Sequence, residues 1–169
     1  MKDCRSLTIA ALCLTLLAAC GYRLAGSGRL PGDVSTIAVS VLTNRTALSG
    51  LESIVTNALV DEFTRRRQNL LVDADRADAV LTGSIDALAT ETVARSGTLT
   101  ALQRRMVITA SLVLKNRNGL VLWEQQITAE ETYTVDALRP ETDRNLRLAS
   151  AQAAQRLAEY AYARLTDTF

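Results

Sequence analysis

The clearest pattern along the chain is an alternation of apolar and polar side chains between Leu102 and Lys115. Successive side chains of a β-strand point to opposite faces, so this alternation predicts a strand with one buried and one exposed face. Within the buried set only Arg104 interrupts the apolar character. The other members of that set are Leu102, Met106, Ile108, Ala110, Leu112 and Leu114.

A turn signal follows this strand at Asn118-Gly119, the dipeptide most typical of a two-residue β-hairpin turn. A tight turn there brings the apolar positions of the first strand opposite the apolar positions of the next, so the register is self-consistent. It also places Thr109 opposite Thr128, on the polar face. The apolar pairs that this register predicts are Leu114 with Trp123, Ala110 with Ile127 and Ile108 with Ala129.

The predicted hairpin is unusually long. At about 3.3 Å per residue, the stretch from Leu102 to Lys115 spans about 45 Å, whereas ordinary strands have about 5–6 residues. We therefore expect its far end to reach beyond the core toward a partner. The alternative is a hairpin that is merely long or bent.

Upstream, the pattern predicts a short strand at Ile37–Val41, a polar loop at Thr43–Leu48 and then a helix. Ser49 and Glu52 have the spacing of a capping box at the start of this helix. The helix ends in Arg65-Arg66-Arg67, which suits the negative end of the helix dipole and favours a solvated last turn over a phosphate site. Its apolar stripe is Leu51, Ile54, Val55, Ala58, Leu59 and Phe63.

A second strand is expected at Ala79–Thr90, in which Gly83 indicates a bulge or a close approach of two backbones. Leu70–Val72 reads as a short strand or edge, and Arg95-Ser96-Gly97 as a turn. A second helix begins near Pro140, with acidic residues in its first turn. Its predicted apolar stripe is Leu146, Ala149, Ala153, Leu157, Tyr160, Ala161 and Leu165.

Together these elements predict an α+β fold, with two helices packed on one face of a roughly four-stranded mixed sheet that contains a long hairpin.

The N-terminus has the pattern of a secretory signal: basic residues, a short apolar run and small residues before a cleavage point. Leu17-Ala18-Ala19-Cys20 resembles the lipobox of bacterial lipoproteins, which implies lipid attachment at Cys20. The alternative is an uncleaved membrane anchor. We therefore expect a signal peptide at residues 1–19, a lipidated, glycine-rich tether at 20–35 and one domain at 36–169. In the Gram-negative lipoproteins that this segment resembles, an aspartate after the cysteine commonly signals retention at the inner membrane; Gly21 stands there instead, so the resemblance implies the outer membrane.

Composition narrows the function classes. The 169 residues include no histidine, which removes Ser-His-Asp and Cys-His catalysis and histidine-ligated metals. The formal net charge of +1 argues against nucleic-acid binding. Glu130-Glu131 would point to opposite faces of a strand and so cannot easily share a substrate. We find no phosphate-binding loop and no metal-ligand cluster in the sequence, and we expect no catalytic residue, no cofactor and no enzymatic activity.

Three segments together resemble the LptE family of lipopolysaccharide-assembly lipoproteins. They are Cys20 with Gly21-Tyr22-Arg23-Leu24-Ala25-Gly26, Ile37-Ala38-Val39 with Asn44-Arg45-Thr46, and Ala77-Asp78-Ala79-Val80-Leu81-Thr82-Gly83-Ser84-Ile85. The order of predicted elements also fits. The resemblance implies a lipid-anchored protein on the periplasmic side of the outer membrane, which plugs the lumen of the LptD barrel and helps to deliver lipopolysaccharide to the outer leaflet.

The resemblance further implies direct lipopolysaccharide binding through basic residues near one end of the sheet. Phosphorylated sugars favour arginine and lysine donors. The candidates on or near the predicted strands and turns are Arg95, Arg104, Arg105, Lys115 and Arg117; ordinary strand solubility is the alternative role for each.

A second resemblance keeps another function open. The strand–helix opening with Asn44-Arg45-Thr46 also resembles lipoprotein activators of peptidoglycan synthases and related periplasmic adaptors. The long hairpin followed by one C-terminal helix favours the LptE-like alternative.

Overall fold

The computed structural model describes residues 30–95 and 102–167. The signal peptide, Cys20 and the turn predicted at Ser96-Gly97 lie outside the described residues. A short 3-10 helix, η1, opens the described chain at Pro31–Asp33. The remaining elements follow in the order β1 (Ile37–Val39), β2 (Thr43–Asn44), α2 (Leu51–Arg66), β3 (Ala79–Arg95), β4 (Leu102–Asn116), β5 (Val121–Val135) and α3 (Arg139–Thr166).

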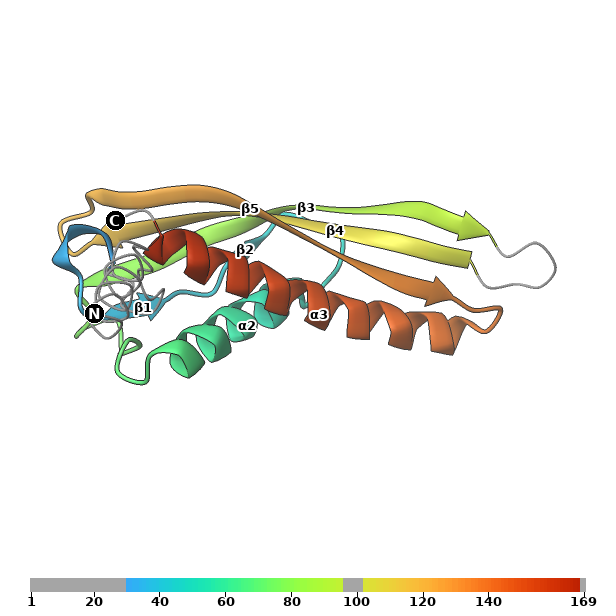
Figure 1. The fold of residues 1–169 in the computed structure, drawn as a ribbon, viewed down its shortest axis with the longest axis horizontal. Coiled ribbons are helices and arrows are strands. Elements are labelled where there is room, and N and C mark those ends of the chain that lie inside the picture. Colours follow the sequence, from blue (N-terminus) through green and yellow to red (C-terminus); the bar gives the residue numbers. More distant parts are fainter. Residues whose placement is uncertain (1–29, 96–101, 168–169) are drawn as a thin grey trace, which may run out of the picture.

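The predicted α+β class is confirmed: both helices lie against one face of a mixed sheet in the order β1-β3-β4-β5 (Figure 1). The described sheet has five strands rather than four, because part of the polar loop predicted at Thr43–Leu48 is a strand. This strand, β2, pairs in parallel with β3 at Ser84 and Ile85. The expected edge at Leu70–Val72 forms a parallel bridge between Leu71 and Ile37.

The predicted register of the β4–β5 hairpin is confirmed over most of its length. Leu114 pairs with Trp123, and the same register continues through Thr109 opposite Thr128. The turn is wider than the expected two residues, because the register shifts between Leu114 and Lys115. Asn118-Gly119 still forms the turn, with Gly119 at a φ of 81° that favours glycine.

β3 is longer than predicted, and it pairs antiparallel with β4 along the whole length of both strands. The long unit is therefore a three-stranded meander rather than a single hairpin. Gly83 marks a close approach and not a bulge: a Cβ atom there would lie 2.3 Å from the carbonyl oxygen of Ser111. The irregularities of β3 come later, between Ile85 and Ala87 and between Thr92 and Ala94.

The core lies between the sheet and the helices. The inward positions of β4 from Met106 to Leu114 are fully buried, and they face the buried stripe of α3. Alanines dominate that stripe, which allows α3 to lie close to the sheet. Residues at the end of the predicted tether belong to this core as well, because Leu30 and Val34 are buried in it.

Two local predictions for the helices are wrong. The capping box at Ser49 does not form, because α2 begins after Gly50, whose φ of 85° excludes that geometry, and Glu52 accepts a hydrogen bond from Asn44. In α3, Tyr160 is 49% exposed and lies off the stripe. Its neighbour Tyr162 packs against Phe63 instead.

The two ends of the sheet differ. We call the end at Arg95 and Leu102 the distal end, and the end at the Asn118-Gly119 turn the proximal end. α3 runs along most of the sheet, whereas α2 lies toward the proximal end (Figure 1). Thr90–Val93 are exposed, whereas Tyr133 and Val135 at the distal end of β5 pack on the core. The uncovered end therefore belongs to β3 and not to the β4–β5 hairpin, for which the sequence predicts it.

Candidate functional site

The surface with the strongest claim to function is the face of β3, β4 and β5 that points away from the helices, here called the open face. Within the described residues no helix packs on it, and the outward side chains of β4 are exposed or half-buried. It is polar and carries both signs of charge. Its polar members include Ser84, Asp86, Glu91, Arg105, Thr109, Ser111, Lys115, Glu124, Gln126, Thr128, Glu130 and Thr132.

Asp86 organises the centre of the open face. It is the extra residue of the β-bulge in β3, a geometry that re-aims a side chain. Its Oδ2 accepts a hydrogen bond of 2.5 Å from the Ser111 hydroxyl, and its Oδ1 accepts one of 2.6 Å from Ser84. Arg45 donates a third at 3.1 Å from the loop before α2. The hydroxyls of Ser111 and Ser84, followed by the Arg45 charge, outweigh partial burial and lower the pKa of Asp86.

The lowered pKa of Asp86 predicts a dependence of stability on pH. Because the folded-state pKa lies below the unfolded value of about 3.9, the stabilisation is present above that value and is lost as pH falls through the folded-state pKa. We expect Asp86→Asn to show a smaller loss of unfolding free energy than the wild type between about pH 5 and about pH 3, as measured by urea denaturation. Asp75→Asn, at an exposed turn position, is the matched control and should follow the wild type. Equal losses in Asp86→Asn and the wild type would contradict the assignment.

Weaker polar pairs continue across β4 and β5. The hydroxyls of Thr109 and Thr128 lie 3.4 Å apart, and Arg105 lies 3.8 Å from the carboxylate of Glu130. Such exposed pairs contribute little stability. The open face therefore presents hydrogen-bonding groups and balanced charge to a wet environment or a polar partner.

The basic candidates fall into two groups. Arg104 and Arg105 lie near the distal end, where the backbone of Arg95 ends β3 opposite Leu102. Lys115 lies at the proximal end, about 34 Å from Arg105 at about 3.4 Å per residue. The five candidates therefore do not form one cluster.

The individual settings of these residues also differ. Arg104 shares the inward parity of Met106 and lies opposite Tyr133, whereas Arg105 is on the open face. Arg117 has a structural role: its guanidinium donates hydrogen bonds of 2.6 and 2.7 Å to the carbonyl oxygens of Ala77 and Arg76. These bonds tie the β4–β5 turn to the loop before β3. Of the four candidates whose side chains are described, Arg117 is thus the one whose guanidinium already bonds backbone carbonyl oxygens.

The arginine run at the end of α2 has a packing role as well. Arg65 and Arg66 both pair with Glu62, a carboxylate that is only 2% exposed. Burial raises the pKa of Glu62, but the hydrogen bonds and charges of the two arginines outweigh burial, so its pKa is lowered. Arg66 also lies over the ring of Tyr162, 5.7 Å from its centroid. These contacts favour the structural interpretation over a phosphate site.

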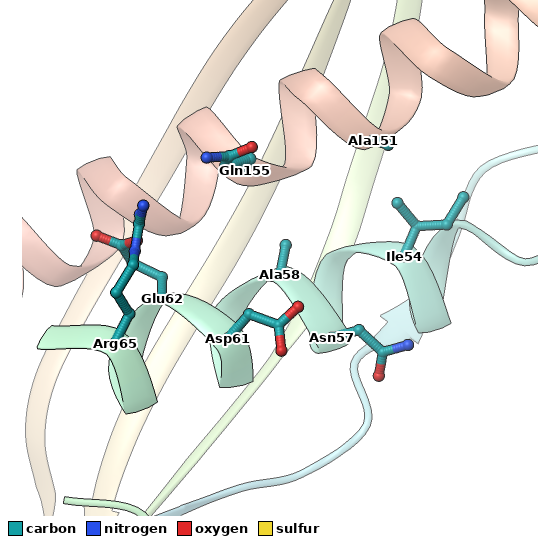
Figure 2. A pocket seen from close by; sticks show the side chains of 8 residues that line it. All are labelled: Ile54, Asn57, Ala58, Asp61, Glu62, Arg65, Ala151 and Gln155. Carbon is teal, nitrogen blue, oxygen red and sulfur yellow. The ribbon is translucent and has the colours of Figure 1, made fainter. Parts of the chain in front are cut away.

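A shallow cleft of about 370 Å³ lies beside this ion pair, between α2 and α3 (Figure 2). Its floor combines apolar and amide side chains, and Glu62 with Arg65 closes one end. The two charged groups at that end satisfy each other. The lining residues are Ile54, Asn57, Ala58, Asp61, Glu62, Arg65, Ala151 and Gln155.

Glu130 and Glu131, the carboxylate pair considered in the sequence, are held apart, and Asp78 has a structural role. Glu130 is on the open face, whereas Glu131 faces the helices and pairs with Arg156 at 3.0 Å. Asp78 accepts hydrogen bonds from Thr36 and Ser35. Across the described part of the chain, no group of three or more metal-ligating side chains gathers in one place.

Sequence reasoning missed the contacts that Asn44, Asn145 and Arg156 make. Asn44 bonds the loop before α2 through the Leu48 carbonyl, and Asn145 and Arg156 reach from α3 to backbone carbonyls of β5. Asn44 lies in one of the segments that carry the family resemblance, and this is the sequence signal that could have pointed to it. The α3 contacts join residues far apart in the chain, and no local pattern marks them.

Comparison with solved structures places the fold among small α+β domains that include a bacterial lipoprotein. A minor lipoprotein from Acinetobacter baumannii is 15% identical, with a TM-score of 0.50 over 79% of this chain and 92% of that one. A protein from Xanthomonas campestris is 10% identical, with a TM-score of 0.54 over 82% and 90% of the two chains. One from Chlamydia trachomatis is 12% identical, with a TM-score of 0.53 over 78% and 95%. At these identities the likeness shows the fold alone.

The family follows from the sequence match. Residues 34–168 match the family model for LptE, lipopolysaccharide-assembly, and the chain belongs to this family. The sequence-based identification is therefore confirmed at the level of the family. The family is one of non-enzymatic outer-membrane lipoproteins. A search of curated proteins finds no significant match. Among the described residues, neither helix combines the length and the apolar character that crossing a bilayer requires.

Proposed function

We propose that this chain is the plug and assembly partner of an LptD-type outer-membrane barrel, and that it aids the insertion of lipopolysaccharide into the outer leaflet. The observation that carries the proposal is the open face, a long sheet surface of hydroxyl, amide and charged groups that no helix of the described chain covers. The lumen of an outer-membrane barrel is itself polar. A partner that bound through apolar surface would need a large exposed apolar patch instead.

The distal end supports the second half of the proposal. Arg104 and Arg105 lie on opposite faces of β4 near its distal end, and Arg95 is close to them in the strand register. Arginine suits phosphate through paired donors. We propose that these three residues carry the lipopolysaccharide contacts, with Lys115 at the other end of the same surface and Arg117 as a structural residue.

An affinity purification of the tagged chain from detergent-solubilised outer membranes tests the proposal. We expect an LptD-type barrel to be recovered in equal amount with the chain, and lipopolysaccharide to be measurable in the same complex. Recovery of a peptidoglycan synthase without a barrel would overturn the plug function and favour the adaptor alternative.

Lipid attachment is tested by Cys20→Ser. We expect this variant to lose the lipid and therefore to leave the outer-membrane fraction, because several acyl chains, at about 0.8 kcal/mol for each buried CH₂, provide the anchor. Intact mass spectrometry and membrane fractionation measure both effects. Cys13→Ser is the matched control: it lies in the expected signal peptide and should leave the mature mass unchanged. A lipidated, membrane-bound Cys20→Ser protein would refute the attachment site.

A further inference from the structure

The two edges of the sheet are treated differently by the rest of the molecule. The distal part of the β5 edge, from Glu130 to Thr134, is covered by side chains of α3. Asn145 donates a 2.9 Å hydrogen bond to the carbonyl oxygen of Thr134, and Arg156 donates one of 3.2 Å to that of Glu130. Side chains that occupy backbone groups in this way prevent another strand from pairing with the edge.

The edge of β3 is covered only over its proximal part. There the carbonyl oxygen of Leu81 accepts a hydrogen bond from Ser40, and that of Ile85 accepts one from Arg45. β1 and β2 provide this cover, and both end before Asp86 is reached. Beyond Ile85, within the described residues, neither a strand nor a side chain pairs with the outer edge of β3.

The backbone groups left open can be identified from the ladder. The Ile85 carbonyl points toward Arg45, so Ile85 and its partner Ala110 form a pair that does not exchange ladder bonds. Such pairs alternate with bonded pairs along β4. The next ones therefore involve Ile108, Met106 and Arg104, whose partners on β3 are Leu88, Thr90 and Thr92. Their N–H and C=O groups point outward.

We infer that this segment, Leu88–Thr92, here called the open edge, accepts an extended segment of the barrel partner as an additional strand. The inference rests on the proposed function. Main-chain hydrogen bonds provide the affinity in strand addition, and alternate side chains provide the specificity. Between the bulges at Asp86 and Val93 the segment carries no proline and, in the described chain, no covering side chain, which is otherwise a liability for a folded protein, and the same molecule covers the distal part of its β5 edge.

Charge and size identify the kind of segment that fits. Glu91 is exposed and lies opposite Arg105, which pairs with Glu130, so within the described residues Glu91 makes no ion pair and a lysine or arginine on the added strand would have a partner. Ala87 and Ala89 precede Glu91 on the same face and leave room for larger side chains. These three residues also border the open face, so an added strand extends the surface that the proposed function gives to the barrel.

A second copy of this chain fits less well. Antiparallel pairing of two open edges centred on Thr90 would place Glu91 opposite Ala89, which offers it no opposite charge. A five-residue edge also buries far less than the roughly 1,200 Å² of a stable interface. The barrel, in contrast, would add the strand to an interface that the open face already provides.

The backbone test is Thr90→Pro in the full-length lipidated chain. Proline removes an outward N–H that makes no ladder bond, a position where an edge strand tolerates it. We expect the barrel recovered with the chain from outer membranes to fall about tenfold, the equivalent of about 1.4 kcal/mol. Ala74→Pro is the control: it is the second residue of an exposed turn closed by the Arg76 N–H and the Asp73 carbonyl oxygen, where proline is tolerated and which lies outside the open face, and its barrel recovery should stay close to that of the wild type.

Hydrogen exchange makes the test independent of whether Thr90→Pro folds. In the wild-type chain alone, the amides of Leu88, Thr90 and Thr92 should exchange rapidly, and in the purified barrel complex they should slow at least about a hundredfold, because protection requires hydrogen bonding. A recovered barrel with these amides still exchanging rapidly overturns the open edge and leaves the plug function standing. Failure to recover any barrel counts against the plug function itself. Protection that grows with concentration in the chain alone would assign the edge to a second copy and overturn the barrel segment.

Discussion

Replacing Phe63 with alanine is expected to lower the free energy of unfolding by about 3–5 kcal/mol, a large part of the roughly 5–15 kcal/mol that holds an ordinary domain folded. The Phe63 side chain is fully buried on α2. Its ring meets that of Tyr162 on α3 edge to face, with centroids 5.4 Å apart, so truncation leaves a cavity between the helices and removes the aromatic pair. Urea denaturation, followed by circular dichroism, measures the change.

Tyr160→Ala is the matched control for this prediction. Tyr160 is also an aromatic residue of the helix layer, but it is 49% exposed, and its truncation should cost no more than about 0.5 kcal/mol. A similar loss in both variants would contradict the placement of Phe63 and Tyr162 at the helix–helix contact.

The same two tyrosines show where prediction from the sequence stops. Helical periodicity alone places Tyr160 in the apolar stripe of α3, because it lies three residues after Leu157. The structure selects Tyr162, since α2 lies on that flank and supplies both Phe63 and the Arg66 guanidinium. The direction from which a second helix approaches is a tertiary property, so periodicity within one helix cannot determine it.

Strand register, by contrast, could be predicted in detail. The alternation along β4 and β5 and the Asn118-Gly119 turn are local signals, and each limits the register independently. The length of β3 could not be predicted in the same way. Its last five residues, Glu91–Arg95, include Val93 as the one large apolar residue, and they form a strand because β4 pairs with them.

The candidate site was predictable in its character but not in its arrangement. The polar face of β4 and β5 follows directly from alternation, and so does the separation of Glu130 from Glu131. The hydrogen bonds of Asp86 depend on a β-bulge that no residue type in the sequence indicates. One of them comes from Arg45, in a loop that is distant in sequence. The sequence groups the basic candidates only by their charge. In the structure Arg105 and Lys115 lie near opposite ends of the long strand β4.

Gly83→Ala tests the link between the core packing and the open face. Because the new Cβ would lie 2.3 Å from the backbone carbonyl of Ser111, which cannot rotate away, β3 and β4 must separate locally. We expect a loss of unfolding free energy of about 3 kcal/mol, at the upper end for overpacking. Gly119→Ala is the control: nothing lies within 4 Å of its Cβ, and only its positive φ should cost about 1 kcal/mol.

Ser111 also donates a hydrogen bond from its hydroxyl to Asp86, so Gly83→Ala should disturb the open face and lower barrel recovery, whereas Gly119→Ala, at the proximal turn, should not. A smaller stability loss in Gly83→Ala than in Gly119→Ala would show that the strands approach each other less closely than described, and the glycine would then have no role in shaping the partner surface.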